Sequence, residues 1–297
     1  MISYWKVKDD FLSWLHNRGL EWDRYVKHLL RYLEKLSKPI NKPMDVVNMF
    51  SGLTMSQKRH LTNGMRNLFN FYQAQGLVGK QYLDVLRDNF PKTSIGVDLN
   101  VPTESDVLAA LRHLEERDKE KRIFALYNLL VDSGLRLVES IRLFNTLVED
   151  SSRLEQLNGF CIQPLGYFRN TKLAYFGFIT SYTLSLIKKC EKPLVYDRTM
   201  GTATKRYEVI SYKYLRKFVF DTMTSEQLNI PESVADFIEG RTSKSVGARH
   251  YMNLKRKAIQ FYPRYRDYLI SLRSKLNKEQ VEEYDDLASW TQNYSSS

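Results

Sequence analysis

The stretch Ser133-Gly-Leu-Arg-Leu-Val-Glu139 joins two apolar helical patterns and decides how the rest of the chain is interpreted. The residues before it, Ile123–Val131, are apolar, and the helix expected after it has apolar positions at Ile141, Leu143 and Leu147. Gly134 permits a tight turn, which places Arg136 at the start of the second helix. A guanidinium beside the free N–H groups of a helix start suits a phosphate. On its own, such a Gly-Leu-Arg stretch is more often a structural helix junction than a phosphate site.

Composition indicates an anionic partner and a reducing compartment. The 297 residues include 45 Lys and Arg against 34 Asp and Glu, a net charge of +11. Such an excess is most often explained by nucleic acid. The only cysteines, Cys161 and Cys190, exclude a disulfide framework and favour the cytoplasm. There is no run of eighteen apolar residues and no signal-peptide pattern at the N-terminus, so neither a membrane partner nor export is expected.

Motifs for metals, nucleotides and other cofactors are absent from the sequence. The cysteines lack CxxC spacing, and the histidines are scattered, at His16, His28, His60, His113 and His250. No Gly-x-x-x-x-Gly-Lys-Ser/Thr run occurs, and the glycines are too dispersed for a dinucleotide fingerprint. We therefore expect a protein that works without a cofactor.

The first ninety residues read as helices. Within Glu21–Ser37, apolar residues recur at three- and four-residue steps, at Trp22, Tyr25, Val26, Leu29, Leu30, Leu33 and Leu36. A second stripe runs through Leu61, Met65, Leu68, Phe69 and Tyr72. Lys58, Arg59 and Arg66 lie off that stripe, where they either form a solvated basic face or contact DNA phosphates.

A proline- and glycine-containing stretch from Phe90 to Pro102 interrupts the periodicity and marks a domain boundary. We expect a helical domain at 1–92, a linker at 93–102, a second domain at 103–275 and a tail at 276–297. Thr103 and Asp106 have capping-box spacing at the start of the second domain. Residues 1–100 carry 15 basic and 9 acidic side chains, so both domains are basic.

The second domain is expected to be mainly helical with a small antiparallel sheet. Gly159–Gln163 and Leu173–Ile179 are short, aromatic and β-branched, and Arg169-Asn170-Thr171 offers a turn before the second. Helices resume at Ser181, near Ser211, after Pro231 and after Ser245. The fold class is therefore mainly α.

Two further basic settings follow in this domain. Lys213 and Arg216 are three residues apart and share one face of a helix. Glu239-Gly-Arg241 forms a turn, and Tyr251 comes ten residues after Arg241. Each setting alone is compatible with a solvated face.

In this order, the three settings resemble the tyrosine recombinases, the λ-integrase-type site-specific recombinases. Arg136 and Glu139 match that family's first arginine motif, Arg216 its second, Arg241 the turn before the nucleophile, and Tyr251 the nucleophile. Lys172 matches the lysine of the family's β-hairpin. Lys213 replaces the usual histidine, Arg241 replaces another, and the step to the tyrosine is ten residues rather than nine. In these departures the sequence resembles the integrases of archaeal viruses and plasmids, the fusellovirus type in particular.

The resemblance implies a helical core-binding domain followed by a catalytic domain that cleaves and rejoins DNA through a 3′-phosphotyrosine. It implies that the partner is a double-stranded DNA attachment site. It also implies that the protein is a monomer when free and forms a homotetramer on DNA, in the cytoplasm of an archaeal host. In such an enzyme Arg136 and Arg216 stabilise the transition state, with Lys213 and Arg241 as further donors. Lys172 protonates the leaving oxygen, and Glu139 orients Arg136.

Several alternatives stay open. A type IB topoisomerase uses similar residues but only relaxes DNA, and a non-catalytic DNA-binding protein can keep the fold. A third alternative, a basic RNA-binding helical protein, lacks an RRM or KH signature. Tyr262, Tyr265 and Tyr268 are other phenols that follow Tyr251. The apolar-aromatic stripe from Leu254 to Leu272 either packs on its own core or, with the acidic tail, docks on a neighbouring protomer.

Overall fold

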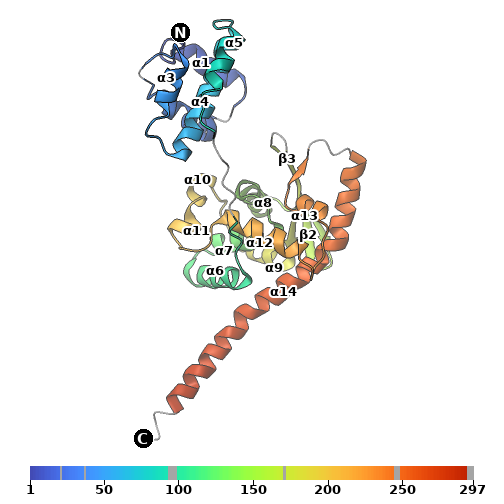
Figure 1. Cartoon of the computed structure of the whole chain (residues 1–297). Coiled ribbons are helices and arrows are strands. Elements are labelled where there is room, and N and C mark those ends of the chain that lie inside the picture. The colour runs from blue at the N-terminus through green and yellow to red at the C-terminus, as the bar shows by residue number, and fades with distance from the viewer. Residues whose placement is uncertain (21, 37, 93–98, 170–171, 244–247, 293–297) are drawn as a thin grey trace. The chain divides into compact units, whose positions relative to one another are not determined.

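The computed structural model describes residues 1–20, 22–36, 38–92, 99–169, 172–243 and 248–292. The chain divides into two compact units, Met1–Asp98 and Leu99–Ser297 (Figure 1). Each unit has its own hydrophobic core. The fold is mainly α with a small antiparallel sheet, which confirms the predicted class. No described helix has both the length and the apolar character needed to cross a membrane.

The described part of the N-terminal unit is helical. Its elements are α1 (Lys8–Asn17), the π-helical turn η1 (Trp22–Val26), α2 (Lys27–Leu33), α3 (Pro43–Met49), α4 (Met55–Ala74) and α5 (Lys80–Arg87). The helices α2 and α4 pack closely because α4 has Gly64 at the contact. A Cβ at Gly64 would lie 3.1 Å from Leu33 Cγ and 3.3 Å from the carbonyl oxygen of Leu29. This contact anchors the core of the unit.

The helix predicted over Glu21–Ser37 is shorter than expected and begins with a π turn; its two end residues lie outside the described part. Val26, Leu29, Leu30, Leu33 and Leu36 are buried as predicted, whereas Tyr25 is 40% exposed and its hydroxyl accepts a hydrogen bond from Asn67 Nδ2. The π turn contains more residues per turn than an α-helix, which moves Tyr25 off the buried stripe.

The second unit is built around α7 (Arg122–Ser133), which is buried from Ile123 to Ser133. Helices pack around it: α6 (Glu104–Arg117), α8 (Leu137–Glu149), α9 (Ser181–Lys188) and α12 (Tyr212–Thr224). The remaining helices are α10 (Tyr196–Thr199), α11 (Thr202–Lys205), α13 (Glu232–Ile238) and α14 (Ala248–Gln292). The predicted capping box is confirmed, since Thr103 Oγ1 accepts from Asp106 N and Asp106 Oδ2 accepts from Thr103 N.

The sheet of this unit is antiparallel, in the order β1-β2-β3-β4. Its strands are β1 (Glu155–Leu157), β2 (Phe160–Arg169), β3 (Lys172–Thr180) and β4 (Thr242–Ser243). The central pair β2–β3 confirms the two predicted strands; the turn residues Asn170 and Thr171 lie outside the described part. The short strand β4 brings the segment after Arg241 against the start of β3, with Lys172 paired to Ser243.

Helix α14 packs its first half on the core of its own unit. Its apolar stripe is buried there, at Leu254, Ala258, Tyr262, Tyr265, Leu269, Leu272 and Leu276. A buried polar network fastens the helix as well. Arg273 pairs with Asp132 of α7, and its guanidinium also donates to Asn128 Oδ1 at 3.1 Å and Thr180 Oγ1 at 3.0 Å. The side chains after Leu276 lie outside the described part, so docking of the tail stays a prediction.

Candidate active site

Arg136 and Glu139 form the first part of the site, at the start of α8. Arg136 is the residue before the helix, and its backbone N–H donates to Glu139 Oε2 at 3.0 Å. Its guanidinium Nη1 donates to Glu139 Oε1 at 2.8 Å. Glu139 is 2% exposed, whereas 29% of the Arg136 side chain is exposed. The buried carboxylate thus orients an arginine whose outer face reaches solvent.

Arg216 approaches the same carboxylate from α12. Its Nη1 lies 3.9 Å from Glu139 Oε2, and its side chain is 11% exposed. Both terminal nitrogens, Nη1 and Nη2, are buried and make no hydrogen bond to any residue that the structure describes. Lys213, one turn earlier on α12, is exposed, and its ammonium lies 4.3 Å from the centre of the Tyr214 ring. Arg216 is therefore the inner arginine of the site and Lys213 an outer cation.

The end of α13 supplies a second carboxylate and a third arginine. Glu239 Oε2 lies 2.7 Å from Arg241 Nε and 3.5 Å from Arg216 Nε, and the Glu239 side chain is fully buried. The guanidinium of Arg241 also lies 4.9 Å from the centre of the Phe220 ring on α12 and 3.8 Å, at Nε, from Oδ1 of the half-buried Asp236. Arg136, Arg216 and Arg241, far apart in the sequence, thus gather around two buried glutamates.

Two glycines in the left-handed region make this convergence possible. At Gly134, φ is +58°, and a Cβ would lie 2.6 Å from Glu239 Oε1. At Gly240, φ is +68°, and a Cβ would lie 2.7 Å from Ala174 Cβ on β3. The carbonyl oxygen of Gly240 accepts a 3.0 Å hydrogen bond from Arg136 Nη1. The predicted turn at Gly134 is therefore real, and it makes room for the carboxylate of Glu239.

The structure describes the backbones of Lys172 and Tyr251, whereas their side chains lie outside the described part. These two residues are therefore placed by their backbones alone. Lys172 is the first residue of β3 and pairs with Ser243, two residues after Arg241. Tyr251 lies in the first turn of α14, on the segment that continues from β4. The topology therefore puts the predicted lysine beside the segment that joins Arg241 to Tyr251.

Three later tyrosines of α14, Tyr262, Tyr265 and Tyr268, have structural partners. The hydroxyl of Tyr262 donates to the carbonyl oxygen of Asp132 at 3.1 Å, and that of Tyr265 to the carbonyl oxygen of Val131 at 2.7 Å. Both rings are fully buried, and burial raises the pKa of both phenols well above the usual value. Tyr268 donates to Glu104 Oε2 at 2.9 Å, and burial with that bond raises the pKa of its phenol. In this conformation none of the three offers a free phenol oxygen for nucleophilic attack.

Burial dominates the electrostatics of the cluster. It raises the pKa of Glu239 to about 8, although Arg216 and Arg241 oppose the shift. It lowers the pKa of Arg216 to about 10, with the positive charges of Arg136 and Arg241 acting in the same direction and Glu239 opposing. Arg216 is still protonated at neutral pH. The site therefore concentrates positive charge in a poorly solvated place, where charge is most effective.

Sequence reasoning missed Glu239 and the strand β4. A glutamate before a glycine at the end of a short helix is usually exposed, and only the fold shows that the turn at Gly134 closes over it. The helix after Pro231 was predicted from the sequence. The one sequence signal that Glu239 lies near the core was the apolar pair Phe237 and Ile238 directly before it, and both residues are buried.

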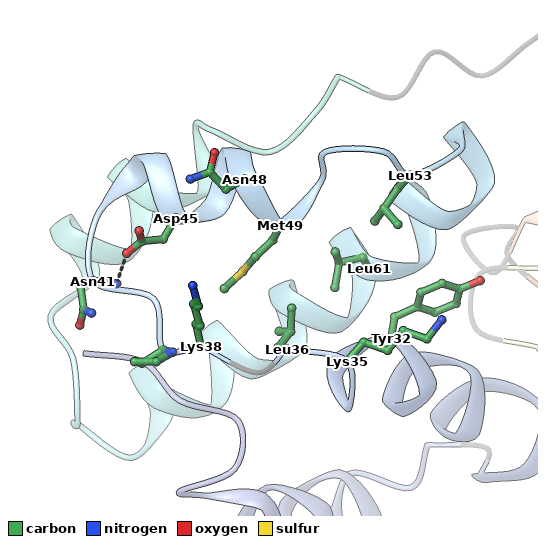
Figure 2. A pocket seen from close by; sticks show the side chains of 11 residues that line it. Tyr32, Lys35, Leu36, Lys38, Asn41, Asp45, Asn48, Met49, Leu53 and Leu61 are labelled. Carbon is green, nitrogen blue, oxygen red and sulfur yellow. Dashed lines mark hydrogen bonds between the residues drawn. The ribbon is translucent and has the colours of Figure 1, made fainter.

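The N-terminal unit contains the other predicted contacts and a hollow of its own. Arg59 and Arg66 are exposed on α4, and Lys58 is half-buried. The hollow has a volume of about 540 Å³; Figure 2 shows Leu36, Met49 and Leu61 pointing toward one another across it, with Lys35 and Lys38 nearby. Asp45 beside it accepts the backbone N–H of Asn41 at 2.9 Å. Among the residues whose side chains the structure describes, those that line this hollow include none of the residues predicted for catalysis.

Comparison with known proteins identifies the family. Among the described residues, no three His, Cys, Asp or Glu side chains gather as a metal site. No curated protein matches the chain. A family model described as archaeal phage integrase matches residues 99–268, more than half of the chain, and this range includes every residue of the arginine cluster as well as Lys172 and Tyr251. The chain therefore belongs to the archaeal phage integrase family.

Proposed function

We propose that the chain is a tyrosine-type site-specific recombinase, which cleaves and rejoins double-stranded DNA through a 3′-phosphotyrosine on Tyr251. The observation that carries the proposal is the arginine cluster. Arg216 presents two buried terminal nitrogens without a hydrogen-bond partner among the described residues, beside Arg136 and Arg241. Because an unsatisfied buried donor is costly, such a site is complementary to an anion such as a DNA phosphate.

The reaction conserves the energy of the phosphodiester bond. The phenol oxygen of Tyr251 attacks phosphorus and loses its proton to solvent; the new O–P bond forms as the bond to the 5′-oxygen breaks. Lys172 donates a proton to that leaving oxygen. In the reverse step a 5′-hydroxyl attacks the phosphotyrosine and releases Tyr251. No external energy source is needed, because one ester replaces another.

Each charged residue has a part in this scheme. Arg136 and Arg216 stabilise the negative charge that grows on the non-bridging oxygens, and Arg241 and Lys213 are additional donors. Glu139 orients Arg136 through the two hydrogen bonds between them. Lys58, Arg59 and Arg66 contact backbone phosphates from the N-terminal unit, which acts as the core-binding domain.

Integration requires more than one copy of the chain. Strand exchange between two attachment sites involves four cleavage events, so four protomers assemble on DNA, while the free protein is a monomer. The reaction takes place where host and viral DNA meet, in the cytoplasm of an archaeal cell. The division into domains at 1–92 and 103–275, with a tail from 276, is part of this proposal.

Covalent trapping tests the function directly. Nicked duplexes with a randomised cleavage region are incubated with the full chain, and DNA that becomes attached in an SDS-resistant manner is selected and sequenced. Mass spectrometry of the adduct should identify Tyr251. DNA binding without any adduct would favour a non-catalytic DNA-binding protein, and relaxation of supercoils without strand exchange would favour a topoisomerase.

A further inference from the structure

Glu239 poses an electrostatic problem for the site just described. Its carboxylate is fully buried, both of its oxygens lack hydrogen bonds among the described residues, and it pairs with the arginines that a phosphate would need. Burying an ion pair costs desolvation free energy, and the carboxylate competes with any incoming anion for the same arginines. An acid at this place must therefore either weaken phosphate binding or lose its charge when phosphate arrives.

The charges of the cluster favour the second possibility. Arg136, Arg216 and Arg241 carry three positive charges, and Glu139 and Glu239 carry two negative charges when both are ionised. The sum is then +1, whereas a phosphodiester that is being attacked gathers about two negative charges. Protonation of Glu239 raises the sum to +2. It also frees Arg216 and Arg241 for the phosphate.

The surroundings of Glu239 support a change of its charge. It faces Arg216 on α12, Arg241 and the half-buried Asp236 near the end of α13, and Arg136 at the start of α8. On α14, the phenol of Tyr265 interacts electrostatically with Glu239, and its hydroxyl donates a hydrogen bond to the carbonyl oxygen of Val131. Glu139 lies nearby but already accepts both bonds from Arg136. Burial raises the pKa of Glu239 to about 8, so its proton equilibrium lies close to physiological pH.

We infer that Glu239 is the internal counter-anion of Arg216 and Arg241, and that it takes up a proton when a DNA phosphate reaches these arginines. The inference rests on the proposed function in taking a DNA phosphate as the ligand. Glu239 is a positioning residue here: above about pH 8 and without DNA it is a carboxylate that holds the two guanidinium groups in place, and with DNA it is a neutral acid that leaves them to the phosphate.

The pH dependence follows from this linkage. The pKa of Glu239 is higher with DNA than without, so binding is strongest below about pH 8, where the free protein already has Glu239 protonated. Above that pH, each bound DNA must bring in a proton, and the apparent Kd should rise up to about tenfold per pH unit. At one unit above the free pKa, proton uptake should approach about one per site.

Calorimetry of the full chain with a short duplex DNA, in buffers of different ionisation enthalpy, measures this uptake. At about one pH unit above the pKa of Glu239 in the free protein, the wild-type chain should take up nearly one proton. Glu239→Gln should lose most of that uptake and the dependence of Kd on pH. Glu232→Gln is the matched control: it removes an exposed carboxylate from the first turn of the same helix and should leave the uptake at the wild-type value. Thermal melts check that each variant is folded.

A second measurement needs no variant. The infrared band of a protonated carboxyl group should grow when DNA is added to the wild-type chain above pH 8. Absence of both the band and the proton uptake in the wild type would overturn the inference, as would full uptake in a folded Glu239→Gln chain. Because proton uptake accompanies binding rather than cleavage, uptake without a covalent adduct would sink the recombinase proposal and leave the role of Glu239 intact.

Discussion

Arg136 donates a 3.0 Å hydrogen bond from Nη1 to the carbonyl oxygen of Gly240, a residue 104 positions later in the chain. The bond ties the turn before α8 to the turn after α13. Glu239 stands between the two turns and contacts the arginines of both α12 and the second turn. The geometry of the site is therefore set by backbone turns as much as by side chains.

Gly240→Ala should lower both stability and cleavage. A residue with a Cβ is strained at φ +68° by about 1–2 kcal/mol, and the added Cβ also meets Ala174 Cβ at 2.7 Å. Relief of that contact moves the carbonyl that holds Arg136. Gly76→Ala is the control, since φ there is +66° but no atom lies within 4 Å of the added Cβ. We expect Gly76→Ala to reduce only the melting temperature; equal cleavage rates for the two variants would contradict this account.

Tyr251→Phe should abolish covalent adducts while leaving DNA binding nearly unchanged, because only the nucleophilic oxygen is removed. Tyr262→Phe is the matched change eleven residues later on the same helix. It removes a buried hydrogen bond to Asp132, so it should cost about 1 kcal/mol of stability and leave adduct formation in place. Gel assays for SDS-resistant complexes and thermal melts measure the two effects. Adducts that persist in Tyr251→Phe and vanish in Tyr262→Phe would show that another phenol is the nucleophile.

Replacing Lys58, Arg59 and Arg66 together by alanine should weaken DNA binding and reduce its salt dependence. Each lost phosphate contact lowers the slope of log K against log salt by about 0.9, so the slope should fall by up to about 3. Lys80→Ala is the control, because Lys80 on α5 is already paired with Asp84 at 2.7 Å. An unchanged slope in the triple variant would mean that this face of α4 does not meet DNA.

Local patterns were enough to predict most elements of the second unit. The capping box of Thr103 and Asp106, the buried helix through Ile123 and the two long strands each depend on residues close together in sequence. The arginines could also be identified, because their order along the chain matches a known family. Their gathering at one place follows from the fold, which that family resemblance implies.

The contacts that join distant segments were beyond the sequence. Nothing local in Glu239 indicates that Gly134 makes room for it, and the pair of Arg273 with Asp132 links residues 141 positions apart. The strand β4 is too short to have a recognisable pattern and exists only because β3 offers a partner. Tyr25 was misplaced for a related reason, since a π turn cannot be distinguished from an α turn by apolar spacing.

The roles of the basic residues can be separated with a modified substrate. Arg136→Ala and Arg216→Ala should each slow cleavage at least about a hundredfold, since losing one donor to a developing oxyanion costs roughly 3 kcal/mol. Lys172→Ala should be equally slow on normal DNA, but for a different reason: the leaving 5′-oxygen no longer receives a proton. Sulfur in place of that oxygen leaves readily without protonation, so a 5′-bridging phosphorothiolate should restore cleavage to Lys172→Ala and to neither arginine variant. The alternative acid is Lys213, which lies on α12 one turn before Arg216. Rescue of Lys213→Ala, with Lys172→Ala still inactive on the sulfur substrate, would move the general acid from the β3 strand to α12.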